Sequence, residues 1–290
     1  MSTSEFVTAC VLGELLNTDS RQLQAALQLD ISSARIEVQC LLQAVLSVNR
    51  AWLLTHPERV LSPDEMARYC ELFGRRLNSE PVAYLLGTRE FYGMEFKVTP
   101  ATLIPRPDTE LLVEQALQRI PECGRCRVLD MGTGSGAIAL AIARARPEAE
   151  IVAVDASAAA LTVASENVQR LNLSNVRLLH SDWFSQLQGE CFDLIVSNPP
   201  YIEADDVHLS QGDVRFEPIS ALASGADGLD DIRRIIFAAH QHLEAGGWLM
   251  FEHGYDQSER VRRLLQQAGF NDITSSRDLS GIERVTLGHT

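Results

Sequence analysis

The spacing of apolar residues divides the chain into parts that fold differently. Up to about residue 87, apolar residues recur three and four positions apart, most clearly at 6–16 and 36–46, which is the spacing of one helix face. Ser62-Pro63-Asp64-Glu65 marks another helix start, because serine and glutamate cap the free amides and proline suits the first turn. Residues 1–87 are therefore predicted to form a small all-helical domain.

Between residues 88 and 103 the helical spacing gives way to alternation. Phe91-Tyr92 and Phe96 lie on either side of Gly93-Met94, which predicts two short strands joined by a turn. We therefore expect a β-hairpin at 88–103 that links the helical domain to the rest of the chain. The two prolines within 104–110 predict a stiff segment ahead of the next helix.

From residue 104 onward, short β-branched runs alternate with helical stretches. The runs lie at 128–129, 151–154, 176–178, 195–196, 248–251 and 285–287, with another near Ile273, and helices are predicted at 232–243 and 256–268. Such alternation is typical of a mostly parallel sheet covered by helices on both faces. The prediction for 104–290 is an α/β domain with a doubly wound, Rossmann-like sheet, whose ligands bind at the carboxyl ends of the strands.

Composition narrows the classes of partner. The 290 residues carry a formal net charge of −14, with a pI near 4.9, so the overall field repels nucleic acid. The first residues lack a basic region, and no apolar run is long enough to cross a bilayer. The expectation is a soluble, cytoplasmic monomer with no DNA partner and no membrane partner.

Several residues with reactive side chains are given structural interpretations. Cys123-Gly124-Arg125-Cys126 is a lone CxxC, so reduced thiols and no metal site are predicted. Asp205-Asp206 and Asp230-Asp231 are interpreted as solvated or capping carboxylates. His253 is interpreted as a hydrogen-bonded structural residue. Arg106 has two interpretations, since it can hold a ligand carboxylate or pair with a local acid.

Three predicted strands end in residues suited to a nucleoside. The first ends in Asp130-Met131 and the glycine-rich turn Gly132-Thr133-Gly134-Ser135-Gly136 before a helix, where the backbone allows close approach of a ligand. The second ends in Asp155, a carboxylate that can accept from both ribose hydroxyls. The third ends near Asp182 and Trp183, which offer an acceptor and an aromatic wall for a base.

The glycine turn alone leaves the reaction open. Gly132-x-Gly134-x-x-Ala137 also fits the dinucleotide-binding fingerprint with alanine in the third place. A nicotinamide-dependent oxidoreductase, or a cofactor-binding module without chemistry, therefore remains an alternative at this point.

The fourth predicted strand ends in Asn198-Pro199-Pro200-Tyr201. The prolines remove backbone donors and stiffen the chain, so the Asn198 amide oxygen and a neighbouring carbonyl can accept both hydrogens of a planar NH₂ group. Tyr201 can stack on the flat group so held. When the two hydrogens are held out of the plane of the group, the nitrogen lone pair becomes localised for attack. The motif predicts an NH₂ clamp, although a proline-stiffened loop would also account for it.

In this order, the four strand ends resemble those of the class I S-adenosylmethionine-dependent methyltransferases that act on planar nitrogens. The resemblance extends to the peptide-chain release-factor glutamine methyltransferases. It rests on the segments Glu90-Phe91-Tyr92-Gly93, Leu103-Ile104-Pro105-Arg106-Pro107-Asp108-Thr109-Glu110, Asp182-Trp183, Asn198-Pro199-Pro200-Tyr201-Ile202 and Phe251-Glu252-His253-Gly254.

The resemblance implies transfer of a methyl group from S-adenosylmethionine to the amide nitrogen of the glutamine in the Gly-Gly-Gln loop of class 1 release factors. It further implies that Asn198, Pro199, Pro200 and Tyr201 form the catalytic clamp. The cofactor would contact Gly132, Thr133, Gly134, Ser135, Gly136, Asp155, Asp182, Trp183 and Asn198.

Two other methyltransferase classes remain as alternatives. A ribosomal-protein glutamine methyltransferase resembles the chain in fold and clamp but differs around 104–110, and a DNA exocyclic-amine methyltransferase is disfavoured by the acidic balance. Residues 1–87 contain no titratable cluster that suggests catalysis, so we expect them to recognise the protein substrate.

Overall fold

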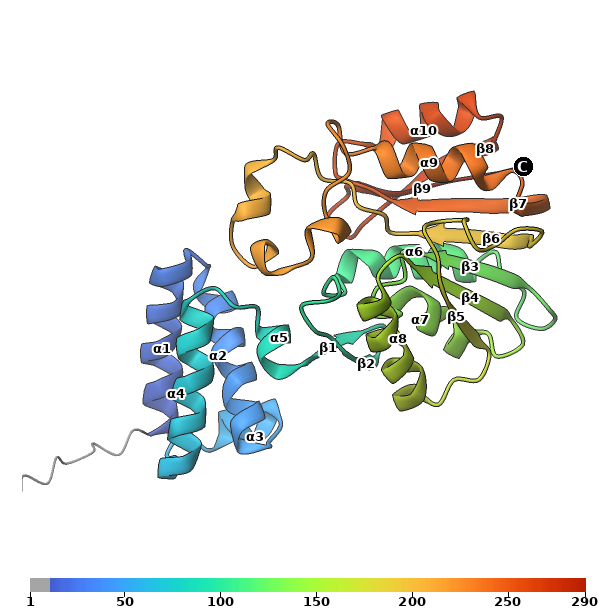
Figure 1. Ribbon diagram of the computed structural model, residues 1–290. Helices are drawn as coiled ribbons and strands as arrows, with labels where there is room; N and C mark the ends of the chain where they lie inside the picture. Colours follow the sequence, from blue (N-terminus) through green and yellow to red (C-terminus); the bar gives the residue numbers. More distant parts are fainter. Residues whose placement is uncertain (1–10) are drawn as a thin grey trace, which may run out of the picture. The chain divides into compact units, whose positions relative to one another are not determined.

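The computed structural model describes residues 11–290 of the chain. Residues 6–10, part of the first predicted helical stretch, lie outside this range. The chain divides into two compact units, Met1–Gly87 and Thr88–Thr290 (Figure 1).

The first unit is helical, as predicted. Its helices are α1 (Leu12–Leu27), α2 (Ile31–Leu46), α3 (Arg50–Thr55), α4 (Pro63–Leu77) and α5 (Val82–Leu86). The capping box at the start of α4 is confirmed, because Ser62 and Glu65 each accept the other's backbone N–H.

Leucine and valine side chains from α1, α2 and α3 form a separate core in this unit. Polar pairs also join its helices. Tyr69 donates to Asp19 at 2.7 Å, and the buried Arg76 pairs with Glu37 at 2.6 Å. Ile36 of α2 is 51% exposed, so part of the apolar pattern faces away from the core.

The predicted hairpin consists of β1 (Thr88–Phe91) and β2 (Met94–Lys97), which pair antiparallel. The turn is Tyr92-Gly93, one residue earlier than predicted, and both residues have positive φ, at 51° and 71°. Such a two-residue turn matches the twist of paired strands. Phe91 and Phe96 are buried in the core of the second unit, so the hairpin packs as part of that unit.

The second unit contains a seven-stranded sheet with the order β5-β4-β3-β6-β7-β9-β8. The strands are β3 (Arg127–Met131), β4 (Glu150–Asp155), β5 (Val176–His180), β6 (Phe192–Ser197), β7 (Leu243–Glu252), β8 (Asn271–Arg277) and β9 (Glu283–His289). The first five in this list run parallel, while β9 is antiparallel to both β7 and β8. The predicted α/β class and mostly parallel sheet are confirmed.

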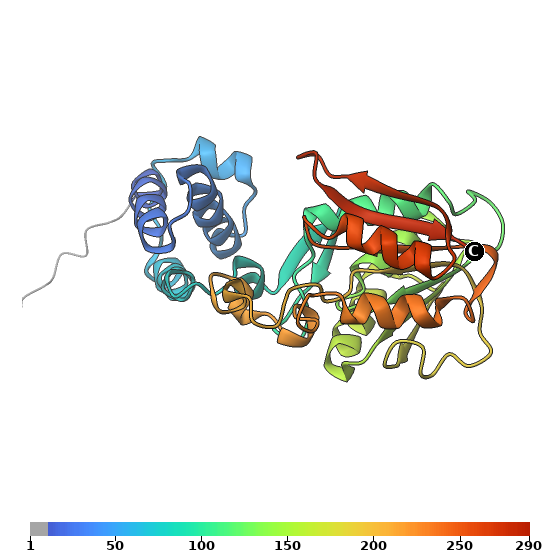
Figure 2. The same cartoon turned by 90° about the horizontal axis from the view of Figure 1, so that it is seen from above.

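Helices cover both faces of the sheet. They are α6 (Glu110–Leu117), α7 (Ala137–Ala145), α8 (Ala158–Leu171), α9 (Asp230–Ala239) and α10 (Ser258–Gln267), with short 3₁₀ turns η1 (Pro107–Thr109), η2 (Val207–Ser210), η3 (Val214–Phe216) and η4 (Ile219–Ala221). The core with α6 and α7 is separate from the core with α9 and α10. The last two helices lie side by side in both views (Figure 1, Figure 2).

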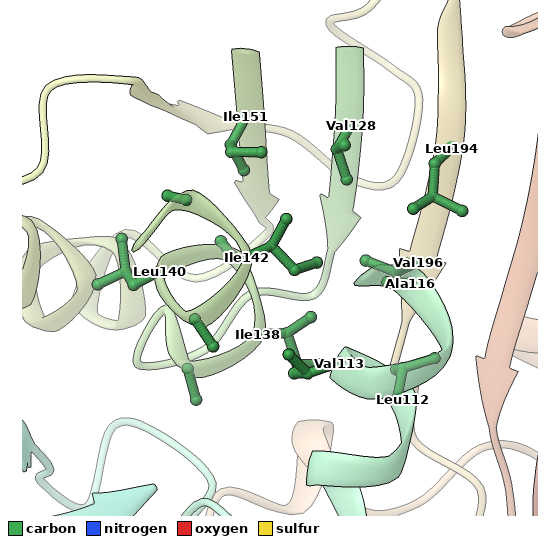
Figure 3. Close-up of a cluster of buried hydrophobic side chains, with 14 of the residues drawn as sticks. Leu112, Val113, Ala116, Val128, Ile138, Leu140, Ile142, Ile151, Leu194 and Val196 are labelled. Carbon is green, nitrogen blue, oxygen red and sulfur yellow. The ribbon is translucent and has the colours of Figure 1, made fainter. Parts of the chain in front are cut away.

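Alternate residues of each strand point to opposite faces, which explains the continuous apolar runs. Val128 belongs to the core under α6 and α7, and the next residue, Leu129, belongs to the core under α9 and α10. Figure 3 shows Ile142 of α7 pointing toward Val128 and Ile151 on the strands.

The helix predicted at 232–243 is shorter in the structure. It ends at Ala239, and β7 already begins at Leu243. Leu243 pairs with Phe192 of β6, so pairing in the sheet overrides the helical spacing at the end of this segment.

Candidate active site

The second unit contains a cavity of about 400 Å³ at the carboxyl ends of β3, β4 and β6. The sheet order reverses between β3 and β6, which is where open α/β sheets bind ligands. The cavity is lined by Ala101, Thr102, Leu103, Pro105, Arg106, Thr109, Gly132, Thr133, Gly134, Ser135, Ala137, Ile138, Asp155, Ala156, Ser157, Ala160, Ser181, Asp182, Trp183, Asn198, Pro200, Pro218, Ser220, Ala221, Asp231 and Arg234.

Hydrogen bonds to the Asp130 side chain hold the glycine turn after β3. Its Oδ2 accepts from the Thr133 hydroxyl at 2.6 Å and from the Ala139 backbone N–H at 3.2 Å. The side chain is fully buried, and burial raises the pKa of this carboxyl to about 7. These bonds fix the turn that carries Gly132 and Gly134 along the cavity.

Gly136 differs from the other residues of the turn because it does not line the cavity. It precedes α7 with a φ of 86°, and a Cβ there would lie 3.1 Å from the side chain of Leu140. Glycine is favoured at this position because other residues rarely adopt this backbone conformation, and a Cβ would also crowd the Leu140 side chain.

Asp155 ends β4 and lies against the glycine turn. Its Oδ2 accepts from the Gly134 N–H at 2.9 Å, and its Oδ1 accepts from the Ser157 N–H at 2.8 Å. Each carboxylate oxygen keeps a further lone pair. The side chain therefore organises the turn and can still accept a hydroxyl from a molecule in the cavity.

Trp183 forms a wall of the cavity next to the turn. A Cβ at Gly132 would lie 3.6 Å from its ring, and the indole N–H donates to Asp231 Oδ1 at 3.2 Å. Asp231 also accepts from the Ser224 hydroxyl at 2.7 Å. The interpretation of Asp231 as a solvated or capping carboxylate is wrong, because this side chain orients Trp183 and lines the cavity.

Asp182 lies at the same strand end but is more exposed. Its carboxylate forms an ion pair with Arg234, at 2.9 Å between Oδ2 and Nη2. Both residues line the cavity, so Arg234 of α9 partly balances the negative charge of the Asp182 carboxylate.

The Asn198-Pro199-Pro200-Tyr201 motif follows β6 and reaches the cavity through two of its residues. Asn198 and Pro200 line the cavity, whereas Pro199 is buried and neither it nor Tyr201 lines it. The Asn198 side-chain Nδ2 donates to the Thr109 hydroxyl at 3.3 Å. The backbone of Tyr201 is fixed by the Leu222 carbonyl at 3.1 Å and by Gln257 Nε2 at 2.9 Å.

Arg106 pairs with Glu217, whose side chain is fully buried. Glu217 also accepts from the Ile104 N–H at 3.4 Å. Burial raises the pKa of Glu217, while the Arg106 guanidinium opposes this rise. Of the two interpretations of Arg106, pairing with an acid is confirmed, although that acid is 111 positions away in the sequence.

His253 is a buried structural residue, as predicted. Its Nδ1 donates to the Gly254 carbonyl at 2.9 Å, and its Nε2 lies 2.8 Å from the Thr286 hydroxyl. Burial lowers the pKa of the imidazole, so the neutral ring accepts from Thr286. The neighbouring Glu252 was not predicted as a site residue, yet it lies fully buried beside Thr109 and Asn198.

Cysteines and candidate metal ligands are scattered through the described residues. In residues 11–290 no three histidine, cysteine, aspartate or glutamate side chains form a group that could hold a metal ion. Burial raises the pKa of the Cys126 thiol to about 11, while Cys123 is exposed. Over the same range, none of the helices is long and apolar enough to cross a membrane.

Two family models match the chain. The PrmC N-terminal domain matches residues 14–87, and the methyltransferase small domain matches residues 107–214. Among solved structures, a methyltransferase from Pyrococcus furiosus is similar with a TM-score of 0.52 and 19% identity, and the match covers 76% of this chain and 98% of that chain. This similarity shows the methyltransferase fold.

Curated relatives match nearly the whole chain. A release factor glutamine methyltransferase from Pseudomonas aeruginosa is 52% identical over 89% of this chain and 94% of its own length. One from Escherichia coli strain K12 is 48% identical over 92% of this chain and 94% of its own length. With this identity over both domains, the chain belongs to the release factor glutamine methyltransferase family.

Proposed function

We propose that this methyltransferase transfers a methyl group from S-adenosylmethionine to the side-chain amide nitrogen of the glutamine in the Gly-Gly-Gln loop of class 1 release factors. The observation that carries the proposal is the place of Asn198, which lines one cavity together with the glycine turn and Asp155. The relatives match the chain over both domains, and their names point to the same substrate.

The residues around the glycine turn fit S-adenosylmethionine. A Cβ at Gly134 would meet no protein atom within 4 Å, so the backbone there borders open space. Asp155 can accept the ribose hydroxyls, and the Trp183 ring offers a flat apolar wall for the adenine. When bound, S-adenosylmethionine supplies an electrophilic methyl group on a positively charged sulfur.

The residues after β6 would orient the acceptor amide. The Asn198 amide oxygen and a backbone carbonyl of the following prolines accept its two hydrogens. This holds the nitrogen lone pair toward the methyl group, and such positioning supplies most of the acceleration. A carbon–nitrogen bond forms as the carbon–sulfur bond breaks, and the methylated nitrogen releases one proton to solvent. The chemistry requires no strong base, because the nitrogen becomes acidic once methylated.

The experiment that tests the proposal incubates the purified protein with methyl-labelled S-adenosylmethionine and one of three acceptors. These are a class 1 release factor, the ribosomal proteins and an adenine-containing DNA duplex. Peptide mass spectrometry then locates the label. We expect label on the Gly-Gly-Gln glutamine and none on the other acceptors. Label on a ribosomal protein or on DNA, without label on the release factor, would overturn the proposal.

The helical unit would provide a second contact for the release factor. It has a core of its own and forms a separate compact unit, and none of its described residues, 11–87, lines the cavity. Deletion of residues 1–87 is expected to lower kcat/KM for the full-length factor by about tenfold, since lost binding contacts raise KM. A steady-state assay measures this ratio.

A short Gly-Gly-Gln peptide is the matched control for this deletion. Because the peptide is too small to span a second contact, its kcat/KM should be the same for the truncated and the full chain. Equal losses on peptide and on full-length factor would assign residues 1–87 a role in folding. Unchanged activity on the full-length factor would exclude substrate recognition by this unit.

A further inference from the structure

Glu252 is a buried carboxyl group that the proposed chemistry leaves without a task. It is the last residue of β7 and is 2% exposed. One of its oxygens, Oε2, has no hydrogen-bond partner. A buried acid with an unpaired oxygen costs folding free energy, so its presence beside the cavity requires an explanation.

The sheet register places this carboxyl directly behind the cavity wall. Ser197 of β6 pairs with Phe251 of β7, so the next residues along the two parallel strands are Asn198 and Glu252. Thr109 approaches from η1 and, like Asn198, lines the cavity, whereas Glu252 does not. Glu252 therefore does not contact a molecule in the cavity directly, whereas Asn198 and Thr109 can.

The hydrogen bonds among the three side chains have a direction. Donation from the Thr109 hydroxyl and the Asn198 amide lowers the pKa of Glu252, because it favours the charged form of this carboxyl. A hydroxyl has one hydrogen, so a Thr109 that donates to Glu252 has only lone pairs left for Asn198. This agrees with the bond in which Asn198 Nδ2 donates to Thr109 Oγ1 at 3.3 Å.

This direction decides which end of the Asn198 amide faces the cavity. An asparagine amide can rotate by half a turn, which exchanges its oxygen and its NH₂ group. Only the oxygen can accept a hydrogen from a substrate amide, and an NH₂ group in its place would meet another donor. An ionised carboxylate only accepts, so it holds the NH₂ group on its own side.

We infer that Glu252 is a positioning residue that fixes the orientation of the Asn198 amide, directly and through the Thr109 hydroxyl, so that its oxygen points to the acceptor nitrogen. The inference rests on the proposed function. It gives a role to an acid in a buried position that an apolar residue could fill.

Several charged groups face Glu252 and influence its titration. Asp108 on η1 raises its pKa, and Arg284 on β9 lowers it. Burial raises the pKa of Tyr201, and the negative charge of Glu252 raises it further. Burial is the largest influence and raises the pKa of Glu252 to about 7. Below this pH Glu252 carries a proton and can donate to Thr109. The carboxyl then no longer acts only as an acceptor, so it no longer holds the Asn198 NH₂ group on its own side.

The experiment compares Glu252→Met with Glu252→Gln, using full-length protein, labelled S-adenosylmethionine and a class 1 release factor. Methionine removes the acceptor, so kcat at pH 8 should fall about tenfold, the effect of one misplaced hydrogen bond. Glutamine keeps one acceptor oxygen and should restore part of kcat. The Kd for S-adenosylmethionine, measured by calorimetry, should change by less than about twofold in both variants because the glycine turn is untouched.

A pH profile separates this role from a structural one. Wild-type kcat should rise as the pH passes through about 7, and both variants should lose the part of this rise that depends on Glu252, since neither methionine nor glutamine titrates. Asp130, whose pKa is also raised to about 7 by burial, is present in all three proteins and contributes equally to each profile. Both variants should also remain folded at pH 8. Glu252 keeps its proton more tightly in the folded chain than in the unfolded chain, so raising the pH through 7 costs wild-type stability that neutral variants retain.

The possible results are distinct. Absence of label on the release factor with wild-type protein would overturn the proposed function and, with it, the role of Glu252. Transfer by wild type together with unchanged kcat and an unchanged pH profile in Glu252→Met would overturn the role of Glu252 alone. A Glu252→Met loss that persists undiminished in an Asn198→Ala background would show that Glu252 does not act through Asn198.

Discussion

Replacing Asn198 with alanine should lower kcat for methyl transfer to the release factor by about a thousandfold, the cost of removing a preorganised hydrogen-bond partner at a reacting centre. The affinity for S-adenosylmethionine should change little, because the glycine turn and Asp155 hold their places through bonds that do not involve Asn198. A loss in kcat with constant cofactor affinity is the mark of an interaction that orients the acceptor. Single-turnover kinetics with saturating cofactor measures it.

Asn198→Asp is the matched variant for this experiment. Aspartate has the size of asparagine and keeps an acceptor oxygen, but it loses the NH₂ group that donates to Thr109. It also places a second carboxyl beside the buried Glu252, which disfavours the charged form of both groups. We therefore expect Asn198→Asp to be nearly as slow as Asn198→Ala. A wild-type kcat in either variant would remove the clamp from the mechanism.

The strand-end residues could be predicted from the sequence because each follows its own β-branched run. Asp155 is the last residue of β4 and Asn198 directly follows β6, and parallel strands bring their carboxyl ends to one edge of the sheet. A local pattern and one general rule of α/β folds are enough for this step. The capping box at Ser62 is local in the same sense, since all its partners lie within four residues.

Pairs formed by the sheet order or by distant loops could not be predicted in this way. Glu252 lies beside Asn198 only because β7 pairs with β6, and no local pattern of either segment contains that register. Asp231 belongs to α9 but orients Trp183, 48 positions earlier in the sequence. In both cases the partner is a polar residue at the end of a helix or strand, so in the sequence it resembles an ordinary helix cap or strand end.

The loop after the clamp shows the same limit. Arg106 and Glu217 each look like an ordinary charged residue, yet their ion pair fixes segment 104–110 against the 3₁₀ turns that follow β6. Pro105 and Thr109 on one side, and Pro218 and Ala221 on the other, then form walls of the cavity. The burial of Glu217 could not be predicted from the residues next to it in the sequence, because it depends on segments that only the fold brings together.

Asp155→Ala should weaken the binding of S-adenosylmethionine by about a hundredfold, since two hydrogen bonds to a charged acceptor together contribute about 3 kcal/mol. The substitution removes the acceptor proposed for the ribose hydroxyls. It also removes the bond that holds the Gly134 N–H at 2.9 Å, so the turn loses part of its order. Isothermal calorimetry without any protein acceptor measures the change directly.

Asp182→Ala provides the comparison that separates a specific contact from a general effect of charge. Both substitutions remove one negative charge from the cavity lining, but Asp182 is the more exposed and is paired with Arg234 at 2.9 Å. Exposed ion pairs contribute little, so Asp182→Ala should weaken binding by only about threefold. Equal losses in the two variants would indicate that the cofactor responds to the overall charge of the cavity. An unchanged Kd in Asp155→Ala would remove Asp155 from the proposed cofactor site.

At saturating cofactor, Asp155→Ala should transfer the methyl group at a rate close to wild type, because Asn198 still orients the acceptor. If Asp155→Ala changes only the Kd and Asn198→Ala changes only kcat, cofactor binding is assigned to the end of β4 and acceptor orientation to the end of β6.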